Sequence, residues 1–242
     1  TPKVLQELGG RALLEHVLTT VRGVNPSQIH VVYGYGGKAV RDAISGSDIN
    51  WVEQEVQLGT GDAVAKAMPF VDKNSNVIVV YGDVPLVRSD TLCRLLEMAN
   101  SDRLALLTSL VSDPTGYGRV VRDSSGSLQR IVEELDANEE EKAISEINVG
   151  LMAAPAKLLD GWLRQLDDTN AQGERYLTDV VHFSVSSSPP AVTCATRDED
   201  EATGINSRAE LANAERIFQR RQANDLMENG LKLFDPSRFD LR

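Results

Sequence analysis

Residues 76–86 read N-V-I-V-V-Y-G-D-V-P-L, and this stretch decides the fold of the chain. Val77 to Tyr81 are apolar and largely β-branched, which is typical of a buried strand. Gly82 and Asp83 follow that strand directly, and Pro85 prevents its continuation. In an open α/β sheet, the ligand crevice lies beyond the carboxyl ends of the strands. Asp83 is therefore placed to hold a metal or a ligand hydroxyl, although Gly-Asp is also common in plain turns.

A glycine-rich segment, Gly59-Thr60-Gly61, precedes this strand and opens into a helix pattern over residues 63–68. Such a junction offers unpaired backbone N–H groups to an oxygen-rich ligand. Together the two segments resemble the sugar-phosphate nucleotidyltransferases, and within them the uridyltransferase domain of the bifunctional bacterial enzyme that makes UDP-N-acetylglucosamine for the cell wall. Further segments fit that family in the same order: Pro2–Leu5, Asp113–Arg119, Ile131–Glu133, Glu146–Gly150, Asn170–Glu174, Tyr176–Asp179 and Gly204–Arg208.

The composition is typical of a soluble globular protein, with 41% hydrophobic and 25% charged residues. No apolar run reaches the roughly 18 residues that a membrane-spanning helix needs. Cys93 and Cys194 lack metal-ligand spacing, so we expect both to be reduced, in apolar surroundings and in the cytoplasm. A net charge of −11 argues against nucleic acid as a partner. Phosphate binding must therefore depend on local Lys, Arg, backbone N–H groups or a bound cation.

Apolar periodicity alternates helices with strands early in the chain, which predicts a Rossmann-like, mostly parallel or mixed sheet flanked by helices. Helices are expected at 11–22, 37–45, 61–68, 89–99, 155–165, 176–186 and 207–229. Strands are expected at 29–33, 50–53, 76–81, 103–110, 118–122, 128–133, 147–153 and 191–195. The charged runs 139–141 and 197–201 are expected to be solvated faces.

The resemblance implies a nucleotide-diphospho-sugar transferase fold that forms one domain over residues 1–242. A nucleotide-binding part (1–110) would be followed by a small β-rich sugar-binding lobe (111–206), a C-terminal helix (207–229) and the start of a linker (230–242). The linker resembles the junction to a β-helix acetyltransferase domain, through which the full-length form is expected to be a homotrimer.

In the resembling family, an apolar strand and a Gly-rich, Arg-containing loop that cradles the phosphates precede the segment equivalent to Pro2–Leu5. Here Thr1 stands directly before that segment. If the polypeptide truly starts at Thr1, the sheet would lack a central strand and expose unpaired backbone edges. For that case we expect a loosened fold and weak UTP binding.

The resemblance also implies which residues bind UTP and Mg²⁺. Uridyl transfer needs charge neutralisation and in-line positioning more than a protein nucleophile. Asp83 and Asn206 would hold Mg²⁺, which takes oxygen ligands and keeps waters, and Lys3 would act with Asp83 in catalysis by neutralising phosphate charge. As alternatives, Asn206 would cap the helix that follows it, and Lys3 would be an ordinary exposed lysine.

Gln54 fits uracil, because a side-chain amide offers a donor and an acceptor to the O4 and N3–H edge. Gly59 and Thr60 would supply backbone N–H and hydroxyl contacts to the base. The remaining residues assigned to substrate on this side are Gln57, Tyr81 and Gly82, of which Gln57 is more simply explained as a polar residue at the end of a strand.

N-acetylglucosamine-1-phosphate is the expected sugar substrate, and the resemblance assigns Gly118, Glu133, Asn148 and Thr178 to it. Asn148 lies between apolar residues of a strand, where an unpaired amide would be costly, so a ligand or backbone partner is expected. Tyr176 is expected to pack in the core.

Three positions depart from the family pattern. Residues 134–136 contain no lysine, Asp62 replaces a usual histidine, and Tyr35 replaces another. The loss of a cation and the added anion bear on catalytic efficiency. The lost lysine and the missing first loop favour, as an alternative, a catalytically weak or silent nucleotidyltransferase-like binding module.

A rival motif, G-Y-G-G-K-A at residues 34–39, follows a strand and opens a helix, and Glu53 ends the next strand. This spacing matches a dinucleotide-binding fingerprint with its ribose-binding acid. A less favoured alternative is therefore an NAD-dependent oxidoreductase, although no downstream constellation indicates hydride transfer.

Overall fold

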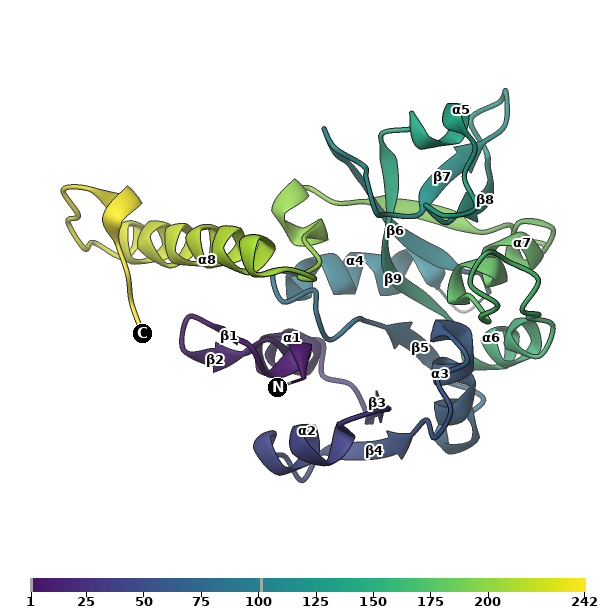
Figure 1. Ribbon diagram of the computed structural model, residues 1–242, viewed down its shortest axis with the longest axis horizontal. Coiled ribbons are helices and arrows are strands. Elements are labelled where there is room, and N and C mark those ends of the chain that lie inside the picture. Colours follow the sequence, from purple (N-terminus) through teal and green to yellow (C-terminus); the bar gives the residue numbers. More distant parts are fainter. Residues whose placement is uncertain (1, 101) are drawn as a thin grey trace.

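A six-stranded mixed sheet forms the centre of the molecule (Figure 1). The computed structural model describes residues 2–100 and 102–242, so the expectation for Thr1 lies outside the described residues. The strands of this sheet are β5 (Asn76–Val79), β6 (Ala105–Leu110), β7 (Arg119–Arg122), β8 (Leu128–Val132), β9 (Glu146–Pro155) and β10 (Val192–Ala195). The prediction of a mixed α/β sheet flanked by helices is confirmed.

Strand β9 organises this sheet. β5, β6 and β7 all pair with it in the antiparallel direction, and β10 continues the sheet as a parallel neighbour of β6. β5 pairs with the C-terminal part of β9, from Met152 to Pro155, whereas β7 pairs with it at Ile147. The strand that leads to Asp83 and the hairpin that carries Glu133 are therefore both positioned by β9.

Alternate residues of β9 join different apolar layers, because successive side chains of a strand point to opposite faces of the sheet. Ile147, Leu151 and Ala153 belong to the cluster that includes α1 (Leu13–Arg22) and α4 (Ser89–Ala99). Met152 and Ala154 belong to the cluster that includes α6 (Ala156–Leu163) and α7 (Val180–Val185). A single apolar strand thus connects the two layers of the core.

A separate two-stranded parallel sheet consists of β3 (Ile29–Tyr33) and β4 (Ile49–Glu53), which α2 (Gly37–Ala43) connects. A cavity of about 830 Å³ lies between β3 and β5, and both strands and apolar side chains of α1 line it. Within the described residues, β3 pairs only with β4, and β5 only with β9. The facing edges of β3 and β5 are thus without strand partners in the described part of the chain.

This cavity corrects the expectation for residues 77–81. The predicted strand is present as β5, but it ends at Val79 instead of Tyr81, and its apolar side chains are half-buried where a buried strand was expected. The physical reason is that the cavity leaves one edge of β5 open.

The other expected helices and strands occur within two residues of their predicted ends, except that the helix expected from residue 176 starts as a 3₁₀ turn, Leu177–Asp179, and α7 itself begins at Val180. The sequence analysis missed a short hairpin of β1 (Glu7–Leu8) and β2 (Arg11–Ala12), as well as α5 (Glu139–Lys142). Gly9 and Gly10 join the hairpin strands with φ of 57° and 79°, the left-handed conformations that a two-residue hairpin turn favours. The helix expected from residue 11 therefore begins at Leu13, and the Gly-Gly pair was the signal for the turn.

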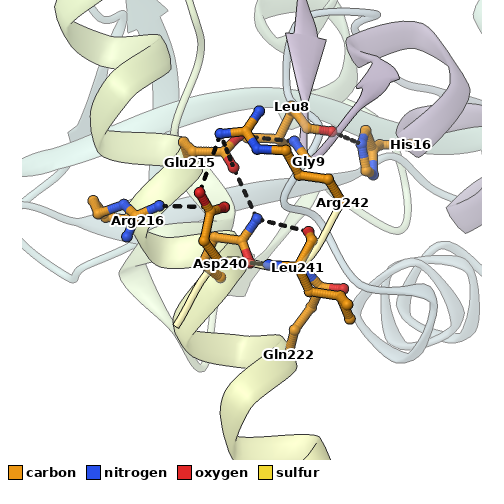
Figure 2. Close-up of polar contacts among 10 residues, drawn as sticks. Leu8, Gly9, His16, Glu215, Arg216, Gln222, Asp240, Leu241 and Arg242 are labelled. Atoms are coloured by element: carbon orange, nitrogen blue, oxygen red, sulfur yellow. Dashed lines mark hydrogen bonds and ion pairs between the residues drawn. The ribbon is translucent and has the colours of Figure 1, made fainter. Parts of the chain in front are cut away.

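Helix α8 (Arg208–Glu228) extends away from the sheet, and the C-terminal residues fold back on it (Figures 1 and 2). Leu241 donates its N–H to Gln219 Oε1 at 2.8 Å and accepts a hydrogen bond from Gln219 Nε2 at 3.0 Å. Figure 2 shows Glu215 close to both Arg242 and Gly9 of the hairpin, and Glu215 Oε2 accepts the Gly9 N–H at 2.7 Å. These contacts fasten α8 to the β1–β2 hairpin.

The hairpin is also tied to α1. His16 Nε2 lies 2.7 Å from the carbonyl oxygen of Leu8, and the His16 ring packs edge-on against Phe218 of α8. Burial lowers the pKa of the His16 imidazole, while its contact with the Leu8 carbonyl opposes that shift. The hairpin therefore connects α1 with α8.

The expectation of a solvated face at residues 197–201 is wrong for Glu201. This side chain is 1% exposed and accepts the backbone N–H of Arg88 at 3.0 Å. Asp198 in the same run lies 2.8 Å from Arg221 of α8. The run thus joins α8 to the segment before α4, a role that depends on partners distant in sequence.

Both cysteines are free, as expected. Cys194 is buried, but Cys93 is exposed, because the buried positions of α4 include Thr91, Leu92 and Leu95 and Cys93 lies off that face. Among the described residues, no helix combines the length and the apolar character needed to cross a membrane.

Two leucines of paired strands test the role of β9. Leu151 of β9 is fully buried, whereas Leu110 of β6 is 72% exposed. Leu151→Ala is expected to lower the free energy of unfolding by about 2–5 kcal/mol because it leaves a cavity in the core. Leu110→Ala is the matched control and is expected to change it by no more than about 0.5 kcal/mol. Urea unfolding of both variants measures the difference, and equal stabilities would contradict the central role of β9.

Candidate active site

Three of the predicted site residues converge on one point. Lys3 Nζ lies 2.5 Å from Asp83 Oδ2 and donates a hydrogen bond to Asn206 Oδ1 at 2.8 Å. The side chains of Lys3 and Asp83 are 39% and 23% exposed, so solvent and ligands can reach them. The Lys3 ammonium group thus contacts a carboxylate oxygen of Asp83 and an amide oxygen of Asn206 at the same time.

Local structure explains this convergence. Lys3 stands in a short 3₁₀ turn, Lys3–Leu5, and Asp83 follows the end of β5. The Ile205 N–H donates to the Asp83 carbonyl oxygen at 3.0 Å, which brings the loop before α8 against the end of β5. Asn206 therefore reaches the same point from a distant part of the chain.

The alternative that Asn206 caps α8 is wrong. Ser207 is the N-cap of this helix, and its hydroxyl oxygen accepts the Glu210 N–H at 3.2 Å. Glu210 Oε2 in turn accepts the backbone N–H groups of Asn206 and Ser207, each at 2.6 Å. This capping box leaves the Asn206 side chain free to face Lys3 and Asp83.

The site offers few protein ligands to a metal. Among the described residues, no group of three or more His, Cys, Asp and Glu side chains could hold a metal ion. Asp83 and Asn206 provide two hard oxygen donors that point at the same cation. A divalent cation that keeps most of its waters, such as Mg²⁺, fits this small donor set.

The Gly59-Thr60-Gly61 loop is braced from a distant segment. The Arg175 N–H donates to the Leu58 carbonyl at 2.7 Å, and the Gly61 N–H donates to the Arg175 carbonyl at 2.8 Å. Gly59 has a φ of 106°, and a Cβ there would lie 2.6 Å from the Arg175 carbonyl oxygen. Only glycine fits at this position, because it tolerates both the positive φ and the close backbone.

Thr60 begins α3 (Thr60–Ala67), and its hydroxyl already has protein partners. Its Oγ1 accepts the Leu177 N–H at 3.0 Å. Burial raises the pKa of the Tyr81 hydroxyl, and a hydrogen bond with Thr60 opposes that rise. Gly150, with a φ of 86°, makes room for the Tyr81 ring. The predicted base contact of Thr60 therefore competes with structural contacts to Leu177 and Tyr81.

Gln54 and Gln57 differ sharply in their surroundings. Gln54 is 7% exposed, and its Nε2 donates to the Gly59 carbonyl at 3.1 Å and to Asp62 Oδ2 at 2.8 Å. The donor end of the Gln54 amide, which we assigned to the base, is thus already used, and the Oε1 acceptor is the end available to a ligand. Gln57 is exposed and rests against Gly34.

The residues predicted for the sugar also come together. Thr178 Oγ1 donates to Glu133 Oε1 at 2.7 Å, and the Asn148 N–H donates to the Gly118 carbonyl at 2.8 Å. A cavity of about 260 Å³ beside them is lined by Glu133, Thr178 and further polar side chains. Tyr176, also in its lining, is 8% exposed, as expected for a packed side chain.

Glu133, which lines this cavity, and Asn148, which does not, each have a distinctive polar environment. Burial raises the pKa of the Glu133 carboxyl, and the hydrogen bond from Thr178 opposes that shift. Asn148 Oδ1 accepts the Gly150 N–H at 3.0 Å, so the expected backbone partner is present. Among the described residues, the Asn148 amide nitrogen donates no hydrogen bond to protein, which leaves it available to a ligand.

The sequence analysis missed an ion pair between buried Arg119 and partly buried Glu134. Arg119 is 1% exposed and lies 2.6 Å from Glu134, which also accepts the Gly116 N–H at 3.1 Å. The pair fixes the 113–118 loop, so Arg119 does not replace the lysine that is absent after Glu133. Leu135, in the segment without that lysine, is 66% exposed. The charged residues in D-P-T-G-Y-G-R and I-V-E-E were the only sequence signal for this pair.

The G-Y-G-G-K-A segment has a local geometry that would suit either a nucleotidyltransferase or an NAD-dependent oxidoreductase. β3, α2 and β4 form a parallel β–α–β unit, and Gly36 has a φ of 76° at the turn into α2. Tyr35 in the glycine-rich turn is 98% exposed, and Glu53 stands at the end of β4. Local geometry alone therefore does not choose between the two families.

A comparison with known families makes that choice. The sequence model of the MobA-like NTP transferase domain matches residues 1–147, more than half of the chain. The chain belongs to this family. An NTP transferase domain excludes the oxidoreductase reading of the G-Y-G-G-K-A motif.

Curated relatives of this NTP transferase domain cover its whole length. The bifunctional protein GlmU of Paraburkholderia phymatum is 48% identical over 241 residues, which are 100% of this chain and 53% of the relative. The bifunctional protein GlmU of Nitrosococcus oceani is 46% identical over the same shares. The chain therefore spans about half the length of the curated relatives that it matches.

A solved structure supports the fold of the NTP transferase domain. A UDP-glucose pyrophosphorylase complexed with UDP-glucose superposes with a TM-score of 0.70 over 91% of each chain, at 14% sequence identity. At this identity the likeness concerns the fold, which is that of the nucleotide-diphospho-sugar transferases, as predicted.

Adjacent residues separate the structural and ligand-binding roles at the start of α8. Ser207→Ala is expected to lower the free energy of unfolding by about 1 kcal/mol, because it removes the helix cap. Asn206→Ala is expected to leave stability within about 0.5 kcal/mol, because its side chain does not cap the helix. Thermal or urea unfolding measures both, and a larger loss in Asn206→Ala would restore the capping role.

Proposed function

We propose that the protein transfers a uridyl group from UTP to N-acetylglucosamine-1-phosphate, which yields UDP-N-acetylglucosamine and pyrophosphate. The observation that carries the proposal is the convergence of Lys3, Asp83 and Asn206 at the end of β5. The identity of 46–48% with the GlmU relatives over the whole chain supports the choice of substrates. A second cavity, beside Glu133, has the polar lining that a neutral sugar needs.

In this reaction an oxygen of the sugar 1-phosphate attacks the α-phosphorus of UTP. A new P–O bond forms, the bond from the α-phosphorus to the bridging oxygen breaks, and pyrophosphate leaves with that oxygen. Charge builds up on oxygens around phosphorus, so the protein has to supply positive charge and fixed positions.

Asp83 and Asn206 would hold Mg²⁺ in the proposed reaction. The bound ion supplies charge neutralisation at the phosphate oxygens. Lys3 holds both oxygen ligands in this structure through its ammonium group, and its flexible four-carbon chain lets the group turn towards phosphate. Lys3 would thus supply a second positive charge in a protein whose net charge is −11.

The nucleobase would lie beside Gln54 and Gly59, with the Gln54 carbonyl oxygen facing the base. Thr60, Tyr81 and Gly82 would border the nucleotide. Gln57 remains assigned to substrate, and it is exposed and rests against Gly34.

The sugar would contact Glu133, Asn148 and Thr178. The Asn148 amide nitrogen and the Glu133 carboxyl offer a donor and an acceptor, which suits hydroxyl groups and an N-acetyl amide. Gly118 would allow close approach, since a Cβ there would lie 3.2 Å from Glu133 Oε2. The divisions at residues 110 and 206 and the trimeric full-length form stay predictions.

One observation favours a weak or silent member of the family as the second candidate. The segment after Glu133 carries no lysine, and Arg119, the nearby buried cation, is paired with Glu134. A binding module of this kind would retain UTP affinity with turnover close to background.

The substrate assignment is tested by pyrophosphate release from the full-length protein with N-acetylglucosamine-1-phosphate and Mg²⁺. UTP is expected to give a higher kcat/KM than dTTP, ATP or CTP. Preference for any of these three would overturn the uracil assignment. UTP binding without turnover would favour the silent module.

Asp83→Ala is expected to reduce turnover by far more than tenfold, since tenfold corresponds to only about 1.4 kcal/mol of transition-state stabilisation. Stability is expected to change by no more than about 1 kcal/mol, because the Lys3–Asp83 pair is partly exposed. Asp42→Ala is a matched control, as it breaks an exposed Lys38–Asp42 pair with the same 2.5 Å separation. Equal turnover in the two variants would refute the role of Asp83.

A further inference from the structure

Asp62 stands at a position where the resembling family usually carries histidine, and the catalytic proposal gives it no role. The residue lies in the first turn of α3 and is 4% exposed. Its Oδ2 accepts a hydrogen bond from Gln54 Nε2 at 2.8 Å, and its Oδ1 lies 3.7 Å from Arg175 Nη1. Both carboxylate oxygens thus face groups that carry hydrogen-bond donors.

The contacts of Gln54 use both of its amide hydrogens. One goes to Asp62 Oδ2 and the other to the Gly59 carbonyl, 3.1 Å from Nε2. A carboxylate and a backbone carbonyl are acceptors only. Turning the amide over would place Gln54 Oε1 against two acceptors at a site where Gln54 is 7% exposed, and such contacts are costly when buried. The orientation of this amide is therefore fixed by its partners.

We propose that Asp62 is a specificity-determining residue, which holds the Gln54 amide so that only its carbonyl oxygen faces the nucleobase. This inference rests on the proposed function, because it concerns the base-binding side of the same site. Asp62 acts through Gln54 and does not itself contact the nucleotide, so it is a positioning residue.

A lone acceptor selects among pyrimidines by the hydrogen on N3. Uracil carries an N3–H donor, which pairs with Gln54 Oε1, whereas cytosine presents an N3 acceptor at the same place. An unconstrained amide could turn over and present its NH₂ group to the cytosine N3. The methyl group of thymine lies away from N3, so this contact separates UTP from CTP but does not separate UTP from dTTP.

Two variants of Asp62 in the full-length protein test the proposal. Asp62→Ala removes an acceptor and is expected to lower the ratio of kcat/KM for UTP over CTP by about fivefold or more. Asp62→Asn keeps a carbonyl oxygen that can accept the Gln54 N–H, so it is expected to restore the ratio to near that of the unmodified protein. A purely structural role would lower kcat/KM for both nucleotides alike and leave the ratio unchanged.

Asp90→Ala is the matched control, because it removes an exposed acid from the first turn of another helix, α4. In this control, the ratio of kcat/KM for UTP over CTP is expected to equal that of the unmodified protein. A ratio in Asp62→Ala within about twofold of that value would overturn the inference. The inference would also be overturned if Asp62→Asn lowered this ratio as much as Asp62→Ala does.

Calorimetric titration of the same variants with UTP and with CTP measures the selectivity without turnover. A protein that binds UTP selectively, loses that selectivity in Asp62→Ala and transfers no uridyl group would refute the proposed function while supporting this inference. Transfer from UTP with undiminished selectivity in Asp62→Ala would refute the inference and leave the proposed function standing.

Discussion

The pairing of three strands with β9 is the constraint on which the rest of this structure depends. β5 reaches the C-terminal part of β9, and its chain continues to Asp83. β7 reaches β9 at Ile147, and its partner β8 leads to Glu133. Because β5 and β7 both pair with β9, and β8 is joined to β9 through β7, the two parts of the candidate site keep a fixed separation. A reaction that joins two substrates in line requires such fixed positions. The apolar side chains of β9, such as Leu151, tie this geometry to the stability of the core.

Charge is distributed unevenly between the two parts of the site. The protein carries a net charge of −11, yet its proposed substrates are anionic. At the nucleotide part, Lys3 is held by one carboxylate and one amide oxygen, so a cation is already stabilised there. At the sugar part, burial raises the pKa of Glu133, and the buried cation Arg119 is neutralised by Glu134. The positive charge that the anionic substrates require would therefore come from Lys3 and from a metal ion held by Asp83 and Asn206.

The glycine-rich loop shows how the two parts of the site are coupled. Its backbone pairs with Arg175, and Thr60 accepts the N–H of Leu177. Thr178, the next residue, donates to Glu133 in the cavity proposed for the sugar. The residues that brace the glycine-rich loop and the residue that donates to Glu133 therefore lie in one continuous segment, residues 175–178. Movement of residues 175–178 would therefore disturb the contacts of both Thr60 and Glu133.

The sequence by itself determined the elements and the ends at which chemistry occurs. The β-branched run before Gly82 predicts a strand that points Asp83 at a ligand crevice, and the helical periodicity of residues 89–99 predicts α4, because local spacing dictates which positions are apolar. Only the tertiary structure decided what lies against those positions. Periodicity does not reveal that Asn206 faces Lys3 while Ser207 caps α8, or that Asp62 orients the Gln54 amide. These outcomes depend on hydrogen bonds between groups that are brought together by the packing of distant segments. The sequence pattern indicates which face of an element is buried, but it does not indicate which segment packs against that face.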